Sequence, residues 1–321
     1  MTRSPLRAAI GAVDRLQQRH GVLGFPFAVI RKYADDGGGR EAALITYYGF
    51  LSIFPVLLLG VTIVSWVLAQ RADLRQRLVV AIVPPALQPS IESAMAAAPT
   101  SAVAVAAGLT GLLLAASGVV SSAYRTLNHL AAVPYRSRAG IMSRSVRVAG
   151  ALGLILTGAV LVGGLTVVAA AWPGLPWVSR AAAALGSCLV VFSTLLMLAR
   201  LLLDRPAPVR ALWPAAVPGA VAVTLALELG TELLPGLVRR AGPVYGGFAT
   251  VAGMFALLYL LSQALVYAAE VAAVRHGRLW PRAIDRDRPT AADVHALALL
   301  AREQERVPGE RVDVVSHPPD G

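Results

Sequence analysis

One cysteine, one lysine and few charged side chains are found among the 321 residues of this sequence. Cys188 has no second cysteine to pair with, so an intrachain disulfide and a cysteine metal site are both excluded. Charged residues make up 15% of the chain, whereas soluble domains carry roughly 25%. At the same time 56% of the residues are hydrophobic. This composition indicates a protein whose main solvent is lipid rather than water.

Residues that carry soluble-enzyme chemistry are also sparse. The five histidines show neither H-x-x-x-H nor H-E-x-x-H spacing, and no Walker sequence or G-x-S-x-G motif occurs. The glycines of "DDGGGR" at 35–40 lack the strand and helix that a phosphate loop needs, so we interpret them as a flexible joint. A metal-dependent nuclease would need clustered His and Asp side chains. We therefore expect a protein that is not an enzyme and that holds no metal or cofactor.

Six charge-poor runs are long enough to cross a bilayer. A hydrocarbon core of ~30 Å needs about 20 mainly apolar residues in a helix. Each run is expected to be helical because lipid offers backbone groups no other partner. The sequence predicts an all-α, polytopic six-helix membrane domain over 42–274. Its spanning helices are expected at about 42–69, 100–121, 146–171, 180–203, 211–230 and 247–274.

The cations have an uneven distribution along the chain. A net charge of +11 can indicate nucleic acid, but in a membrane protein the position of the cations matters more than their sum. Arginine is frequent in residues 1–41, after the second run and from residue 275 onward, and it is sparse in the alternate loops. Cytoplasmic loops carry the excess of Lys and Arg. We expect both termini in the cytoplasm and no nucleic-acid partner.

Three segments lie outside the expected spans. Residues 1–41 are expected to be a cytoplasmic N-terminal segment, and they lack the apolar region of a cleavable signal peptide. Residues 73–98, interrupted by two adjacent prolines, are expected to form short interfacial helices on the outer face. Residues 275–321 are expected to be a cytoplasmic, partly disordered tail. Within it, Thr290 and Asp293 have the spacing of a helix cap.

The last run carries a polar stripe. Tyr259, Gln263, Tyr267 and Glu270 follow at spacings of four, four and three, so they share one helix face. Such a stripe faces protein or water rather than lipid. It could line a substrate path, or it could pack against neighbouring helices. Glu270 needs a cation, and the arginines expected at its level are Arg125, Arg200 and Arg275. Structural ion pairing is the default role for Glu270, and a proton-coupling or substrate role is the alternative.

The first and second runs carry further polar residues near the cytoplasmic side. Tyr48, Ser52 and Pro55 share a face of the first run, where Pro55 removes a backbone hydrogen bond and Ser52 can help to satisfy the freed groups. The second run ends in "SSAYRTLNHL". Together with Tyr47, Arg200 and Glu270, the residues of this segment are expected to form a polar zone that contains arginine. This zone would lie at the inner leaflet, where anionic headgroups lie. Helix packing and ordinary positive-inside charge are the alternatives.

Three segments resemble the YihY/BrkB family. "AALITYYGFLSIFPVLLLG" is similar to its first-helix signature, "SSAYRTLNHL" to the exit of its second helix, and "GPVYGGFATVAGMFALLYLLSQALVYAAEVAAVRHG" to its closing helix. The resemblance covers roughly residues 30–280. It implies a multi-pass protein of the bacterial inner membrane with six helices and cytoplasmic ends. The carried-over positions are Tyr48, Ser52, Pro55, Asn128, Tyr245, Gly246 and Glu270.

The function suggested by these features is transport. The resemblance implies links to serum resistance and envelope lipid export, and the family's older label as a ribonuclease BN does not fit a chain without nuclease residues. We expect a flippase-like exporter of an amphipathic or anionic lipid-linked substrate, with membrane lipids as partners. A non-transporting envelope scaffold is the alternative, a membrane-bound ribonuclease is the third hypothesis, and homo-oligomerisation is open. The candidate substrate-path residues are Tyr47, Tyr48, Ser52, Pro55, Tyr124, Arg125, Asn128, Arg200, Tyr245, Tyr259, Gln263, Tyr267 and Glu270.

Overall fold

The computed structural model describes residues 14–19, 21–67, 88, 93, 102–170, 176–205, 207–245, 247–285 and 288–314. Within these ranges the chain is helical and forms no strand, as the sequence predicts. The long helices are α3 (Gly38–Val67), α6 (Ala102–Leu130), α7 (Ile141–Ala170), α8 (Pro176–Leu202), α9 (Val209–Tyr245) and α10 (Gly247–Gly277). The shorter elements are α2 (Gly21–Asp35), the 3₁₀ turn η1 (Tyr135–Ser137) and α11 (Ala291–Glu303).

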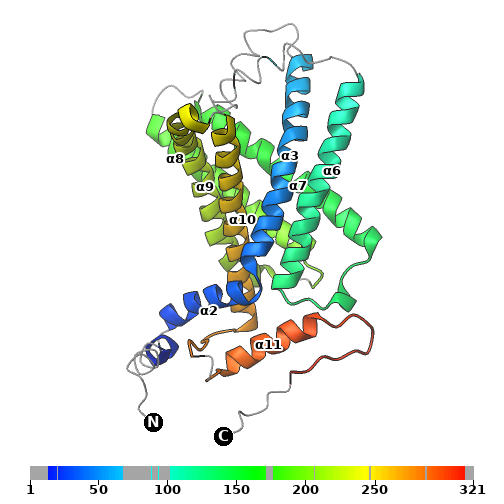
Figure 1. The fold of residues 1–321 in the computed structure, drawn as a ribbon, viewed down its shortest axis with the longest axis vertical. Coiled ribbons are helices and arrows are strands. Elements are labelled where there is room, and N and C mark those ends of the chain that lie inside the picture. The colour runs from blue at the N-terminus through cyan, green and yellow to red at the C-terminus, as the bar shows by residue number, and fades with distance from the viewer. Residues whose placement is uncertain are drawn as a thin grey trace.

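The long helices form a ring of neighbours (Figure 1). Helix α3 packs against α6 and α10, α10 against α9, α9 against α8, and α8 against α7. Smaller contacts of α6 with α7 and α8 close the ring. Helix α2 packs against α10 and α3, and Figure 1 shows α2 and α11 at the end of the bundle where α6 and α10 terminate. We call this end the base; it comprises α2, α11 and residues 131–140, 278–285 and 288–290.

Four helices have the length and hydropathy of membrane spans. They cover Ile141–Ala169, Ala181–Leu202, Val209–Gly230 and Phe248–Gly277. Their outward surface is apolar: Val160 on α7 is 73% exposed and Leu185 on α8 is 74% exposed. Contiguous apolar surface of this kind is stable only in an apolar solvent. The chain is therefore a multi-pass membrane protein.

Each of the six predicted runs corresponds to one long helix, with some changes at the ends. Helix α6 continues past the predicted residue 121 to Leu130, and α7 begins at Ile141 rather than at 146. Helices α3 and α6 are not among the four candidate spans within the described residues, so the count of six spans and the sidedness of the termini stay predictions. The predicted outer segment 73–98 lies outside the described residues except for 88 and 93.

The base contains more order than the sequence predicts. Helix α2 occupies part of the N-terminal segment, and the expected flexible joint before α3 is a tight turn in which Gly37 has φ +67°. A left-handed backbone of this kind favours glycine. The predicted tail helix is confirmed as α11. Thr290 and Asp293 form a reciprocal capping box at its start.

Ion pairs between distant segments hold the base together. Arg282 is 2% exposed and joins α2 to α11, with 2.7 Å from its Nη2 to Asp35 and 2.6 Å from its Nε to Asp293. Beyond α11, Glu305 lies 2.8 Å from Arg136 of the 3₁₀ turn. Because these contacts are buried or partly buried, solvent screens them less than it screens surface pairs. They fix α11 across the ends of the membrane helices.

Candidate functional site

A cavity of about 600 Å³ lies inside the ring, between α6, α8, α9 and α10 and above the base. Its volume is within the range of roughly 300–1,000 Å³ that is typical of sites for small molecules. Most of its lining consists of Ala, Leu and Val side chains, among them Leu127, Leu196, Ala199, Leu212 and Ala269. This part of the cavity suits hydrocarbon rather than a polar ligand.

Among the residues that the structure describes, charged and titratable side chains line the cavity only where it meets the base. This group, which we call the floor, consists of Lys32, Asp35, Asp36, Arg205, His276, Arg278, Arg282 and His295. Three of its cations, Arg205, Arg278 and Lys32, come from different segments of the chain. Arg205 and Arg278 are exposed, whereas Lys32 is buried. The cavity is thus amphipathic, with an apolar chamber and a cationic floor.

The buried lysine of the floor is paired with two carboxylates. The Lys32 ammonium bonds to Asp36 one turn further along the chain and lies 3.0 Å from Glu270 of α10. It also donates to the Leu130 carbonyl at the end of α6, at 2.9 Å. Glu270 is 0% exposed and Lys32 is 6% exposed. Lys and Glu are rarely buried unless they are paired, so the pair links the base to α10.

This pairing corrects one expectation. The sequence suggests Arg125, Arg200 or Arg275 as the cation for Glu270, but all three are exposed, and the partner is Lys32. Arg125 donates only to the Ser121 carbonyl of its own helix, at 3.3 Å. The structure therefore does not bring these arginines together with Glu270. The i, i+4 spacing of Lys32 and Asp36, directly after the apolar residues 21–30, is the sequence signal that could have indicated a buried cation.

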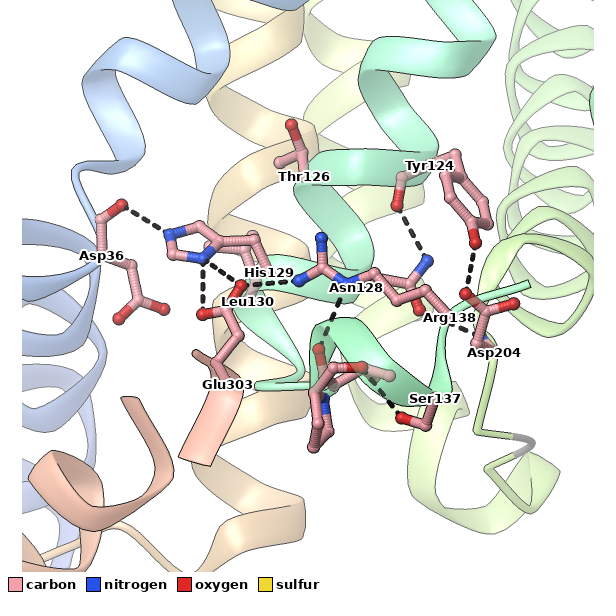
Figure 2. Close-up of polar contacts among 12 residues, drawn as sticks. Asp36, Tyr124, Thr126, Asn128, His129, Leu130, Ser137, Arg138, Asp204 and Glu303 are labelled. Carbon is pink, nitrogen blue, oxygen red and sulfur yellow. Dashed lines mark hydrogen bonds and ion pairs between the residues drawn. The ribbon is translucent and has the colours of Figure 1, made fainter. Parts of the chain in front are cut away.

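A second buried ion cluster adjoins the first at the end of α6 (Figure 2). The Nδ1 atom of His129 lies 2.8 Å from a Glu303 oxygen, and its Nε2 atom lies 3.1 Å from the Asp36 carbonyl oxygen. Arg138 holds the other Glu303 oxygen at 2.6 Å. Both ring nitrogens face acceptors, which favours the imidazolium with two N–H donors. The hydrogen bond with Glu303 is the largest cause that raises the pKa of His129, to about 9, at a position beyond the predicted span.

Asn128 ties α6 to the end of α8. Its amide nitrogen donates to the Leu202 and Tyr124 carbonyls, both at 2.9 Å, and its carbonyl accepts from the Asp204 amide at 2.9 Å. The Tyr124 hydroxyl bonds to the Asp204 carboxylate, which also pairs with Arg147 at 3.1 Å. Figure 2 shows this cluster on the opposite side of α6 from His129. Asn128 and Tyr124 are placed as anchors and do not line the cavity.

The polar stripe of α10 faces α2 rather than the cavity. The Tyr33 hydroxyl donates to Gln263 at 2.5 Å, and Gln263 donates to the Tyr259 hydroxyl at 2.7 Å. The Tyr33 ring stacks on the Tyr267 ring with 4.3 Å between their centroids. Three of the predicted path residues are therefore brought together with a tyrosine of the base, and none of them lines the cavity.

The candidates on α3 contact α6. A Cβ atom on Gly118 would lie 2.7 Å from the Tyr48 ring, so the ring lies against the bare backbone of α6. Tyr47 is 55% exposed and contacts the Tyr48 ring edge-on. The Ser52 hydroxyl donates to the Gly49 carbonyl at 2.7 Å, not to the groups that Pro55 leaves free. The Tyr245 side chain lies outside the described part of the structure.

Comparison with known proteins places the chain in a family. A family model described as virulence factor BrkB matches residues 29–293, a range that includes Lys32, Glu270 and the membrane helices. Neither the curated proteins nor the solved structures contain a match. The match covers most of the 321 residues. The resemblance seen in the sequence is thus confirmed, and the chain belongs to the virulence factor BrkB family.

Proposed function

We propose that this protein binds an amphipathic, anionic lipid-linked substrate of the cell envelope and carries it across the inner membrane as a flippase-like exporter. The observation that carries the proposal is the amphipathic cavity inside the ring of helices. A lipid has the matching chemistry, since its chains are apolar and its headgroup is polar.

The apolar chamber supports binding of the hydrocarbon part. Leu127, Leu196 and Leu212 line it from α6, α8 and α9, and alanines such as Ala199 and Ala216 leave room between the helices. Small side chains at helix contacts let helices approach each other closely. Here the small alanine side chains also occupy less of the space between the helices, which leaves more room for a ligand. Of the described lining residues, an acyl chain in this chamber meets no charged one until it reaches the floor.

The floor supports recognition of an anionic headgroup. Arg205 follows α8, Arg278 follows α10, and both line the cavity with their side chains exposed. Arginine binds phosphate and carboxylate through two parallel hydrogen bonds. His276 and His295 line the same end and supply further donors. A headgroup bound here lies on the side of the bundle that the arginine distribution assigns to the cytoplasm.

The proposal is tested by measuring lipid transfer in proteoliposomes that contain a variant whose cavity is filled by a large side chain. Ala199→Trp puts an indole into the chamber and should abolish protein-dependent movement of a fluorescent phosphatidylglycerol between leaflets. The matched control is Ala182→Trp on the same helix, at an exposed position outside the cavity lining. Equal transfer by both variants and the wild type, or no transfer by any of them, would reject the proposal.

The cavity also separates this proposal from the scaffold alternative. A scaffold needs only a solid bundle with a binding surface, and it gains nothing from an internal space of about 600 Å³ with a charged floor. The cavity therefore favours a binding protein over a scaffold.

A further inference from the structure

The Lys32 ammonium is surrounded by three partners, two held by hydrogen bonds and the third, Glu270, by an ion pair. An ammonium group has three N–H donors, and the Lys32 Nζ contacts Asp36, the Leu130 carbonyl and Glu270. Lys32 nevertheless lines the cavity. An anion in the cavity can therefore reach this ammonium only if one of the three partners is displaced.

Glu270 is the partner whose displacement costs least. The Leu130 carbonyl belongs to the end of α6, and Asp36 lies in the turn that joins α2 to α3. Glu270 is 0% exposed, and neither of its oxygens accepts a hydrogen bond from any described residue, although one lies 3.0 Å from the Lys32 ammonium. A buried carboxylate with incomplete hydrogen bonding is costly as an anion. A proton on this carboxylate would remove the charge and weaken its hold on Lys32.

The charges around Glu270 reinforce this conclusion. Two carboxylates, Asp36 and Glu270, share the single Lys32 ammonium, and burial raises the pKa of Asp36 despite the neighbouring cation. Helix α9 approaches α10 closely at Gly219, and residues 211–227 of α9 carry no ionisable side chain. The other titratable or charged groups on the elements around this region fall into two sets. The first lies on the packed helices: Arg31, Tyr33 and Asp35 of α2, Arg40 and Glu41 of α3, His129 of α6 with its partners Glu303 and Arg138, and Tyr267, Arg275 and His276 of α10 itself. The second lies on the cavity floor: Arg205, Arg278, Arg282 and His295.

We propose that Lys32 is a binding residue for a phosphodiester headgroup in the cavity, and that protonation of Glu270 releases Lys32 to bind it. The inference rests on the proposed function and identifies the headgroup class and a coupling ion. A proton from water converts the Glu270 carboxylate to a carboxylic acid. Lys32 keeps its own protons and directs the freed N–H to a phosphate oxygen. The added proton balances the charge of the anion, so the two bind together.

The test uses the wild-type protein purified in detergent and a short-chain phosphatidylglycerol. A phosphodiester keeps one negative charge across neutral pH, so any pH dependence comes from the protein. Short-chain phosphatidylcholine is the reference without net charge, and glycerophosphoglycerol supplies the same headgroup without chains. Binding of phosphatidylglycerol in weakly buffered solution should take up roughly a third of a proton per protein, averaged between about pH 5.5 and about pH 8.5, because a tenfold change in affinity over about three pH units requires that amount. Its affinity should fall roughly tenfold between about pH 5.5 and about pH 8.5, within the usual range of coupling between sites.

Variants identify the residues involved. Glu270→Gln mimics the protonated acid, so it should bind phosphatidylglycerol with the same affinity at both pH values and without proton uptake. Lys32→Met should lose the preference for phosphatidylglycerol over phosphatidylcholine. Glu310→Gln is the control, since Glu310 lies in the tail after α11, away from the cavity lining, and its removal should leave the proton uptake unchanged.

The outcomes separate this inference from the proposed function. Phosphatidylglycerol binding without proton uptake by the wild type, or a pH dependence that persists in Glu270→Gln, overturns the inference alone, provided that Ala199→Trp still blocks lipid binding. Absence of lipid binding at either pH overturns both. Glycerophosphoglycerol that binds with the same proton uptake supports the Lys32 site but identifies a soluble phosphodiester as sufficient. The wild-type proton measurement decides the question even if a variant fails to fold.

Discussion

Asn128 and Asp204 are joined by a 2.9 Å hydrogen bond in which the Asp204 backbone amide donates to the Asn128 side-chain carbonyl. The same asparagine donates to the Leu202 carbonyl, one of the last that α8 leaves without a helical partner. A single side chain on α6, which is 0% exposed, therefore satisfies backbone groups at and just after the end of α8. This contact sets the position of the loop that carries Arg205 to the cavity floor.

Asn128→Ala should reduce the stability of the bundle. The substitution leaves the Leu202 carbonyl and the Asp204 amide buried without a partner, at a cost of roughly 1–3 kcal/mol for each such group. Thermal unfolding in detergent should show a clear drop in Tm. Ser193→Ala on the exposed face of α8 removes only a bond to the Leu189 carbonyl of its own helix and should change stability by less than about 0.5 kcal/mol. Equal effects of the two substitutions would contradict the anchoring role.

Gly118→Ala should disturb the contact between α3 and α6. The new methyl group would lie 2.7 Å from the Tyr48 ring, and overpacking of this kind typically costs about 1–3 kcal/mol. Gly153→Ala in α7 is the matched control because a Cβ there meets nothing within 4 Å. The cost of Gly118→Ala should largely vanish in a Tyr48→Ala background. A cost that persists there would show that the clash involves another group.

The pair of His129 with Glu303 should make stability depend on pH. The pKa of His129 is raised from 6.5 to about 9, so folding favours the protonated ring. Its stabilising contribution is fully present below pH 6.5 and is lost as the pH rises through about 9. The Tm in detergent should therefore decline over this window, and His129→Gln should flatten the decline. An identical pH profile for the wild type and the variant would rule out this assignment.

The helices of the bundle could be predicted because the signal for each is local. A run such as 146–171 has one charged residue, Arg147 near its start, and exceeds the length of a bilayer core, and lipid allows it only a helical backbone. The cap of α11 was equally local, since Thr290 and Asp293 lie three residues apart. Helix α2 is not predicted, because residues 1–41 taken together are basic and indicate a cytoplasmic segment without a defined helix.

The site could be predicted only in part because its residues are far apart in the sequence and come together only in the folded protein. Glu270 was identified as an acid that needs a cation, but its partner Lys32 belongs to the N-terminal segment, and no spacing rule joins the two. The cavity wall gave no signal, since residues such as Ala199 and Leu212 are common in any membrane helix. The arginines are expected as partners of Glu270 only because they lie at a similar depth in the membrane. Depth does not decide on which face of a helix a side chain lies.

The most direct test of the account is where a lipid chain lies when it is bound. Phosphatidylglycerol with a photoreactive group on one acyl chain can be crosslinked in proteoliposomes and the labelled residues found by mass spectrometry. The account predicts labels at Leu127, Leu196 and Leu212 inside the cavity, and their loss in Ala199→Trp. Labels confined to the outward-facing Val160 and Leu185, with no change in that variant, would contradict it.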